Sequence, residues 1–157
     1  MNHSSLKRRF LFVATVFFLL SISGRVTSAG PSPVIATVQK VNGIATVDRQ
    51  GQTTLAKIGL EIWENDTLRT GPDGSVGVVF SDDTLLSLGP ESVLVIDEFV
   101  FAPHQGEFSL VIKMLKGTAV YLSGLISKLS PESARFETPS ASIGIRGTKF
   151  AVKVEEN

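Results

Sequence analysis

The strongest constraint on the fold is the regular spacing of turn residues. From Val34 onward, short stretches rich in β-branched and aromatic residues are separated by Gly, Pro, Asn, Asp and Ser at intervals of about ten residues. Alternation is clearest in residues 75–80, where Val76, Val78 and Phe80 fall on one face. The pattern predicts strands over residues 34–41, 44–49, 53–57, 75–80, 84–88, 93–101, 108–116, 118–122, 134–138 and 148–155.

Helical periodicity is almost absent from the same region. The nearest approach is residues 120–129, where Leu122, Leu125, Ile126 and Leu129 predict one helical turn. Strands that follow one another through short reversals, without crossover helices, favour antiparallel pairing. We therefore expect an all-β fold, an antiparallel jelly-roll-like β-sandwich of about ten short strands.

The N-terminus has the layout of an export signal. Lys7, Arg8 and Arg9 precede an apolar run over residues 10–22, and no acidic residue occurs there. The run is shorter than the roughly 20 residues of a membrane-spanning helix. Small residues follow it, so we expect a signal peptide at residues 1–29 cleaved after Ala29. Retention as a membrane anchor is the alternative, and the Arg pair leaves the general secretory and twin-arginine routes open.

The remaining residues, 30–157, are predicted to form one β-domain. Its length is 128 residues once 29 are removed from 157, which is ordinary for a single domain. The chain has no cysteine, which excludes disulfides, thiolate metal sites and thiol nucleophiles. Loss of residues 1–29 removes four basic residues and no acid, leaving 11 basic against 15 acidic, or about −4. We therefore expect a periplasmic or secreted bacterial protein that does not bind nucleic acid and is not integral to the membrane after cleavage.

Candidate catalytic and metal-ligating residues are sparse, and we expect no catalytic residue, metal or cofactor. His104 is the only histidine of residues 30–157 and falls in a polar turn. Acidic residues cluster at positions 61–66, 82–83 and 97–98, but Asp66 and Asp82 fall where turns favour side chains that bond their own backbone. The serines form no nucleophile elbow, and residues 144–148 lack the lysine of a phosphate-binding loop.

Trp63 is the best candidate for an exposed aromatic side chain. It is flanked by Glu61, Glu64 and Asn65 in a predicted loop, whereas most other aromatic residues fall in apolar stretches that predict core packing. Trp63 is therefore a candidate ligand face.

The C-terminal segment contains a specific motif. Thr138 and Pro139 are followed by a small residue, an apolar-Gly-apolar step through Gly144, and then Arg146-Gly147-Thr148 before an apolar strand. This motif resembles the end of the FecR domain. Upstream segments agree at residues 43–47, 66–71 and 75–85, although Asp83 stands where the family usually has Gly. The resemblance covers about residues 38–154 and implies a jelly-roll-like β-domain.

The motif residues have physical roles that the sequence suggests. Pro139 closes a strand by removing a donor, and Gly144 and Gly147 permit turns or close approaches. Arg146 is interpreted as a structural latch onto backbone carbonyls or a carboxylate such as Asp66 or Asp82, with contact to a ligand as the alternative.

FecR regulators that resemble this domain also carry a cytoplasmic segment that binds a sigma factor and a C-terminal domain that meets an outer-membrane receptor. Only nine residues precede the apolar run here, and the chain ends at Asn157, so we expect both parts to be missing. The expected function is an exported, non-enzymatic binding or interaction module with an envelope protein partner, in signalling or regulation. The alternative is a module that binds carbohydrate or cell-wall peptidoglycan.

Overall fold

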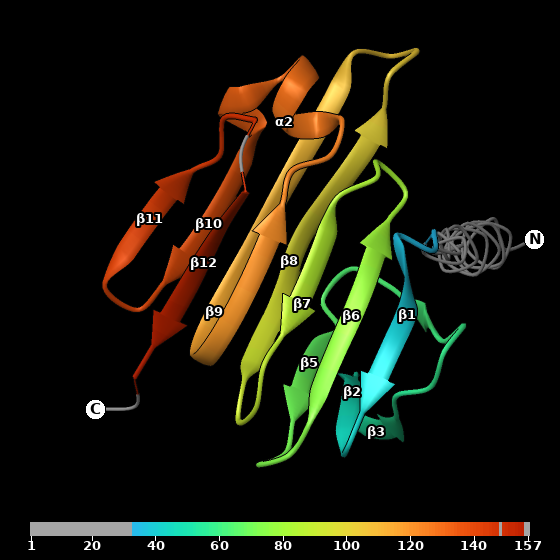
Figure 1. The fold of residues 1–157 in the computed structure, drawn as a ribbon. Coiled ribbons are helices and arrows are strands. Elements are labelled where there is room, and N and C mark those ends of the chain that lie inside the picture. The colour runs from blue at the N-terminus through green and yellow to red at the C-terminus, as the bar shows by residue number, and fades with distance from the viewer. Residues whose placement is uncertain (1–32, 148, 156–157) are drawn as a thin grey trace, which may run out of the picture. The chain divides into compact units, whose positions relative to one another are not determined.

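The computed structural model describes residues 33–147 and 149–155 (Figure 1). The predicted signal peptide at 1–29 lies outside the described residues. The described chain is dominated by strands, with one short α-helix and one 3-10 turn. The strands are β1 (Ala36–Asn42), β2 (Ala45–Arg49), β3 (Gln52–Leu55), β4 (Glu61–Ile62), β5 (Thr67–Thr70), β6 (Ser75–Phe80), β7 (Leu85–Leu88), β8 (Val93–Ala102), β9 (Glu107–Leu122), β10 (Ala134–Thr138), β11 (Ala141–Gly144) and β12 (Lys149–Val154); the helices are α2 (Ile126–Leu129) and η1 (Pro131–Ser133).

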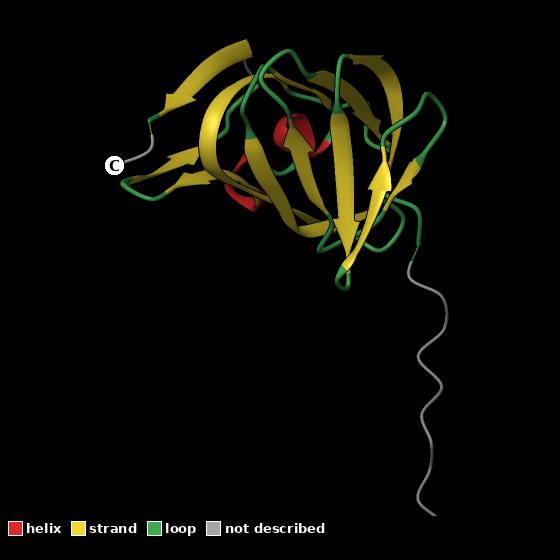
Figure 2. Ribbon diagram, turned by 90° about the horizontal axis from the view of Figure 1, so that it is seen from below, coloured by secondary structure: helices red, strands yellow, loops and turns green. Residues whose placement is uncertain are grey.

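The strands form a curled sheet with two layers, which Figure 2 shows nearly end-on. Layer A has the order β4-β1-β6-β7-β9-β12, and layer B has the order β3-β2-β5-β8-β9-β10-β11. β9 belongs to both layers, because its first part pairs with β8 and β10 and its second part pairs with β7 and β12. This shared strand joins the two layers on one side of the core.

The passage of β9 from one layer to the other occurs at Gly117. Gly117 has a φ of +92°, and a Cβ there would collide with the side chain of Ser92. Only glycine meets both conditions without strain. The hydroxyl of Ser92 accepts a hydrogen bond from the Thr118 N–H (2.9 Å) and donates one to the Thr118 carbonyl (3.1 Å). The two predicted strands 108–116 and 118–122 are therefore one bent strand.

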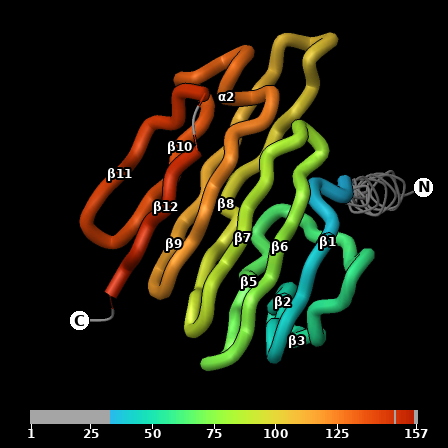
Figure 3. The backbone as a smooth tube through the Cα atoms, in the orientation of Figure 1, coloured from blue at the N-terminus to red at the C-terminus, as the bar shows by residue number. Residues whose placement is uncertain are grey.

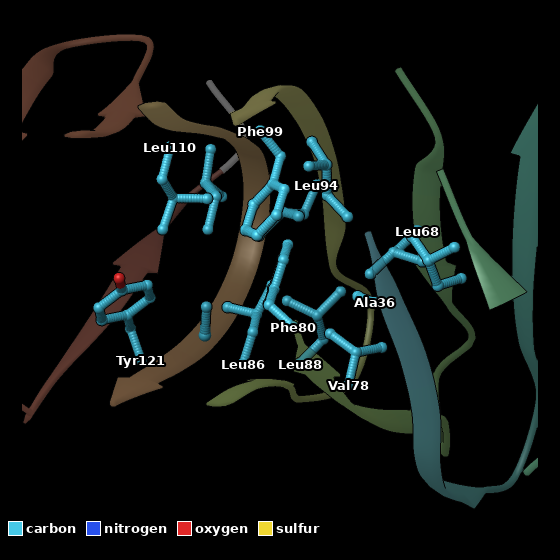
Figure 4. Packing of buried hydrophobic residues seen from close by; sticks show 14 of the residues in the cluster. Ala36, Leu68, Val78, Phe80, Leu86, Leu88, Leu94, Phe99, Leu110 and Tyr121 are labelled. Carbon is cyan, nitrogen blue, oxygen red and sulfur yellow. The ribbon is translucent and has the colours of Figure 1, made fainter. Parts of the chain in front are cut away.

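The core lies between the two layers. In Figure 4, Leu94, Phe99 and Leu110 of layer B face Phe80 and Leu86 of layer A. The rings of Phe80 and Phe99 stack with their centroids 5.4 Å apart. The alternation predicted for residues 75–80 is confirmed, because Val76, Val78 and Phe80 are buried while the residues between them are not.

The all-β, mainly antiparallel prediction is confirmed, and the predicted helical turn within 120–129 is present as α2. The jelly-roll arrangement stays a prediction. Three short strands were not predicted, namely β4, β5 and β11. One pairing is parallel, because β10 runs beside β9 in the same direction after the chain returns through α2 and η1.

Candidate functional site

Asp82 is fully buried in the turn between β6 and β7. Its carboxylate accepts hydrogen bonds from the Thr84 N–H (3.0 Å), the Thr84 hydroxyl (2.9 Å) and the Ile126 N–H at the start of α2 (3.1 Å). The Asp82 carbonyl also accepts from the Leu125 N–H, at 2.7 Å. The bond to the Thr84 N–H, two residues ahead, is the turn role that the sequence predicted. Asp82 therefore fixes α2 against layer A.

The surroundings of Asp82 are closely packed and polar. The Thr84 hydroxyl accepts a hydrogen bond from the Gly124 N–H (3.1 Å), and a Cβ on Gly124 would collide with the backbone of the β6–β7 turn. The Tyr121 hydroxyl lies 3.3 Å from the hydroxyl of Ser127. Burial raises the pKa of Tyr121, the negative charge of Asp82 adds to this effect, and the hydrogen bond to Ser127 partly offsets it.

A second fully buried carboxylate, Asp66, lies just before β5. The Arg49 guanidinium binds both of its oxygens, with Nε at 2.8 Å and Nη2 at 2.6 Å. The Trp63 N–H donates a third bond at 2.8 Å, and Arg49 also donates to the Glu61 carbonyl. The hydrogen bonds to Asp66 raise the pKa of Arg49. This bidentate ion pair connects the end of β2 to the loop before β5.

Trp63 is half-buried rather than fully exposed. The Arg49 guanidinium carbon lies 3.7 Å from the centroid of its ring, so a cation–π contact occupies one face of the indole. A cavity of about 280 Å³ is lined by Arg49, Trp63 and Asp66, together with Gln50, Glu64 and Asn65. Within the described residues, the indole N–H is buried without a hydrogen-bond partner. The predicted ligand face of Trp63 stays a prediction.

The other acidic candidates have local partners or are exposed. Glu64 accepts a hydrogen bond from the Phe99 N–H (3.1 Å), and Asp97 pairs with Lys113 (2.7 Å). His104 is exposed in the turn between β8 and β9. Within residues 33–147 and 149–155, no three His, Cys, Asp or Glu side chains gather as metal ligands do.

The C-terminal motif forms the path from layer B to layer A. Thr138 ends β10, and Pro139 and Ser140 form the turn to β11, where the Thr138 hydroxyl accepts a bond from the Ala141 N–H (3.0 Å). Pro139 thus follows directly on the end of a strand, as predicted. Ile145 is buried, and its N–H donates to the Ala134 carbonyl at 2.9 Å.

The two motif glycines differ. Gly147 has a φ of +54°, which favours glycine, whereas a Cβ on Gly144 would meet open space and nothing there requires a close approach. Thr148 lies outside the described residues.

Arg146 does not make the predicted contacts. Its side chain is exposed, and no hydrogen bond or ion pair joins it to another described residue. The expected pairing with Asp66 or Asp82 is wrong, because Arg49 binds the first carboxylate while Thr84 and Ile126 bind the second. The choice between a structural role and ligand contact stays a prediction.

A groove lies beside the same motif, between the β10–β11 hairpin and β12. Its volume is about 610 Å³. Apolar residues from both layers line it, including Leu115, Ile143, Val152 and Val154, and the hairpin turn at 138–141 closes one side. The sequence predicted neither the groove nor β11, since four residues with one apolar side chain of moderate size give little strand signal.

The model of the FecR protein family matches residues 66–157, more than half of the chain. The protein therefore belongs to the FecR family, a family of regulatory and signalling proteins associated with the cell envelope. The matched segment begins at Asp66 and includes Asp82, the groove and the C-terminal motif. A search of curated proteins and a search of solved structures returned no match.

The departure from the family at Asp83 has a structural explanation. Asp83 has a φ of +66°, in the left-handed region where glycine is favoured and aspartate is among the better-tolerated alternatives.

Among the described helices, none is long and apolar enough to cross a membrane.

Proposed function

We propose that this protein is exported and acts as a FecR-family module that binds a protein partner in the cell envelope, as part of signalling or regulation. Membership of the FecR family is the observation that carries the proposal. The basic residues and apolar run of segment 1–29 support export. The predicted charge of about −4 after cleavage supports a protein rather than a nucleic-acid partner.

The use of the buried carboxylates favours binding over chemistry. Asp66 and Asp82 are the most enclosed acidic groups of the described chain, and each is saturated with donors that hold neighbouring segments in place. A general acid or base must instead present its carboxyl group to a substrate.

The glycan-binding alternative depends on stacking against Trp63 and has less support. Sugar rings stack on an open aromatic face, and the Arg49 guanidinium already covers one face of this indole. The half-buried position of Trp63 reduces the remaining contact area further.

Photo-crosslinking in the native envelope tests the proposal. A photo-reactive residue is placed at an exposed position, such as Ala151, and adducts are identified after fractionation. We expect a specific protein adduct in the periplasmic fraction. Absence of any protein adduct would contradict the proposal. Retention on isolated peptidoglycan that Trp63→Ala abolishes, with the fold intact by circular dichroism, would replace it with the glycan-binding alternative.

A further inference from the structure

Beyond β9, layer A has one described strand, β12, whereas layer B has two, β10 and β11. In layer A, β12 is the last described strand, and it lies over β10, as the contact between the rings of Phe150 and Phe136 shows (centroids 5.5 Å apart). Layer B continues for one more strand, β11, which forms the outer margin of the molecule beyond β12 in Figure 3. The inner face of β11 therefore has no strand of layer A above it.

The groove of about 610 Å³ occupies this place. Ile143 is the inward residue of β11, since it lies opposite the fully buried Phe136. Val152 and Val154 are the inward residues of β12 that line the groove, and all three side chains remain only half-buried. Apolar side chains thus line this slot from both layers, and Lys153 and Glu155 add charged groups to its lining.

The free edge of β12 borders the same slot. Among the described strands, β12 pairs only with β9, so its other side is an edge of layer A. The edge spans the six residues Lys149–Val154, or about 20 Å of strand. A bound strand there would complete layer A and cover Ile143.

We propose that this slot binds an extended segment of a partner protein as an added strand of layer A, beside β12, with apolar side chains alternating with acidic ones. The inference rests on the proposed function and names the surface used. Apolar side chains of the segment would fill the slot against Ile143, Val152 and Val154. On the outward face, β12 presents Lys153, whose ammonium is ion-paired with the exposed Glu155 carboxylate (2.7 Å). An acidic side chain on a directly adjacent strand would compete with Glu155 for this ammonium, since opposite charges on neighbouring strands are favourable.

A second copy of this chain fits the slot less well. Two β12 edges paired about a two-fold axis would place both copies of layer B on the same side of the joined layer A. Each β11 would then occupy the space beneath the other copy's β12, where β10 already lies. The extra strand in layer B thus opposes self-pairing while leaving room for a single strand.

A synthetic peptide of alternating valine and glutamate tests the proposal on the exported form of the protein. We expect binding that shifts the backbone amide NMR signals of β11 and β12. Ile143→Lys should weaken the affinity at least about tenfold, because it places a charge in the slot. Ser142→Lys is the matched control on the opposite face of β11 and should change the affinity less than about twofold.

Charge reversal provides a second test that leaves the core intact. Lys153→Glu should weaken binding of the glutamate peptide and strengthen binding of a valine–lysine peptide, whereas Lys128→Glu on α2 should do neither. Failure of the wild-type protein to bind, or equal binding by the Ile143 and Ser142 variants, would overturn the proposal. A dimer that Ile143→Lys dissociates would assign the slot to a second copy and also overturn it.

The same variants separate this inference from the proposed function. If the envelope crosslink forms but its yield is equal in Ile143→Lys and Ser142→Lys, the slot is not the binding surface, although the protein remains an interaction module. If no envelope protein is captured while the peptide still binds, the proposed function fails and the slot stands as a strand-binding surface.

Discussion

The two buried aspartates show two different ways of holding a carboxylate inside one domain. Asp66 is paired with a cation, since the Arg49 guanidinium binds both of its oxygens. Asp82 is held by neutral donors from Thr84 and from the first turn of α2. The Arg49 side chain is 28% exposed and so reaches water, whereas the donors around Asp82 are buried. Loss of the carboxylate should therefore have unequal consequences at the two sites.

The largest effect is expected for Asp82→Ala. The substitution removes the carboxylate that accepts hydrogen bonds from three buried donors. Each buried donor left unpaired costs about 1–3 kcal/mol, so we expect the free energy of unfolding to fall by about 4 kcal/mol. Asp82→Asn retains one acceptor oxygen and should cost about half as much. Denaturant unfolding followed by circular dichroism measures both. A loss below about 1 kcal/mol for Asp82→Ala would show that α2 is held by packing alone.

A smaller loss, about 3 kcal/mol, is expected for Asp66→Ala, because Arg49 can turn toward water once its partner is gone. The double variant Arg49→Met/Asp66→Leu should be less destabilised than the sum of its single variants, since no unpaired charge remains. Additive losses in this cycle would mean that the pair is not coupled. Among the described residues, Asp82 has no charged partner, so no such compensation is expected there.

The pKa of Tyr121 should respond to the charge of Asp82 but not to that of Asp66. Tyr121 is the only tyrosine of the chain, so an ultraviolet titration reports on it directly. Its pKa is raised in the folded state, so its contribution to stability is present below pH 10 and is lost as the pH rises through the folded pKa. Tyr121→Phe should remove this alkaline loss. Asp82→Asn should lower the tyrosine pKa toward its usual value, whereas Asp66→Asn should leave it unchanged.

The smallest effect is expected for Arg146→Ala. Since the side chain is exposed and contacts neither carboxylate, we expect a change in unfolding free energy below about 0.5 kcal/mol. A drop of several degrees in the melting temperature would restore the latch interpretation that the motif suggested. Comparison with Gly147→Ala, which strains a positive φ, provides a control with a backbone cost.

The sequence predicted the elements whose side chains alternate strongly, such as β6, because a one-sided burial pattern specifies both strand and face. It did not predict β4 or β11, which have two and four residues and depend on their neighbours for pairing. The break predicted near Gly117 was wrong because glycine marks a bend within β9, and turn residues do not distinguish bends from strand ends.

The candidate sites were partly predictable for similar reasons. The structural role of Asp82 was predictable, because aspartate in a turn commonly accepts a hydrogen bond from the backbone N–H two residues ahead, here that of Thr84. The pairing of Arg49 with Asp66 joins residues 17 positions apart through the register of β2 and β5, which composition does not encode. The slot beside β12 depends on one layer having an extra strand, and only the full strand order reveals it.

The sharing of β9 between the layers also determines when this chain can fold. Strands β7 and β8 are consecutive in sequence but belong to different layers, and each pairs with β9. Until residue 122 is available, both layers end in an unpaired edge, so a shorter chain has no closed core. Such non-local pairing is typical of domains that fold in milliseconds to seconds. The chain can thus remain unfolded until β9 has been synthesised.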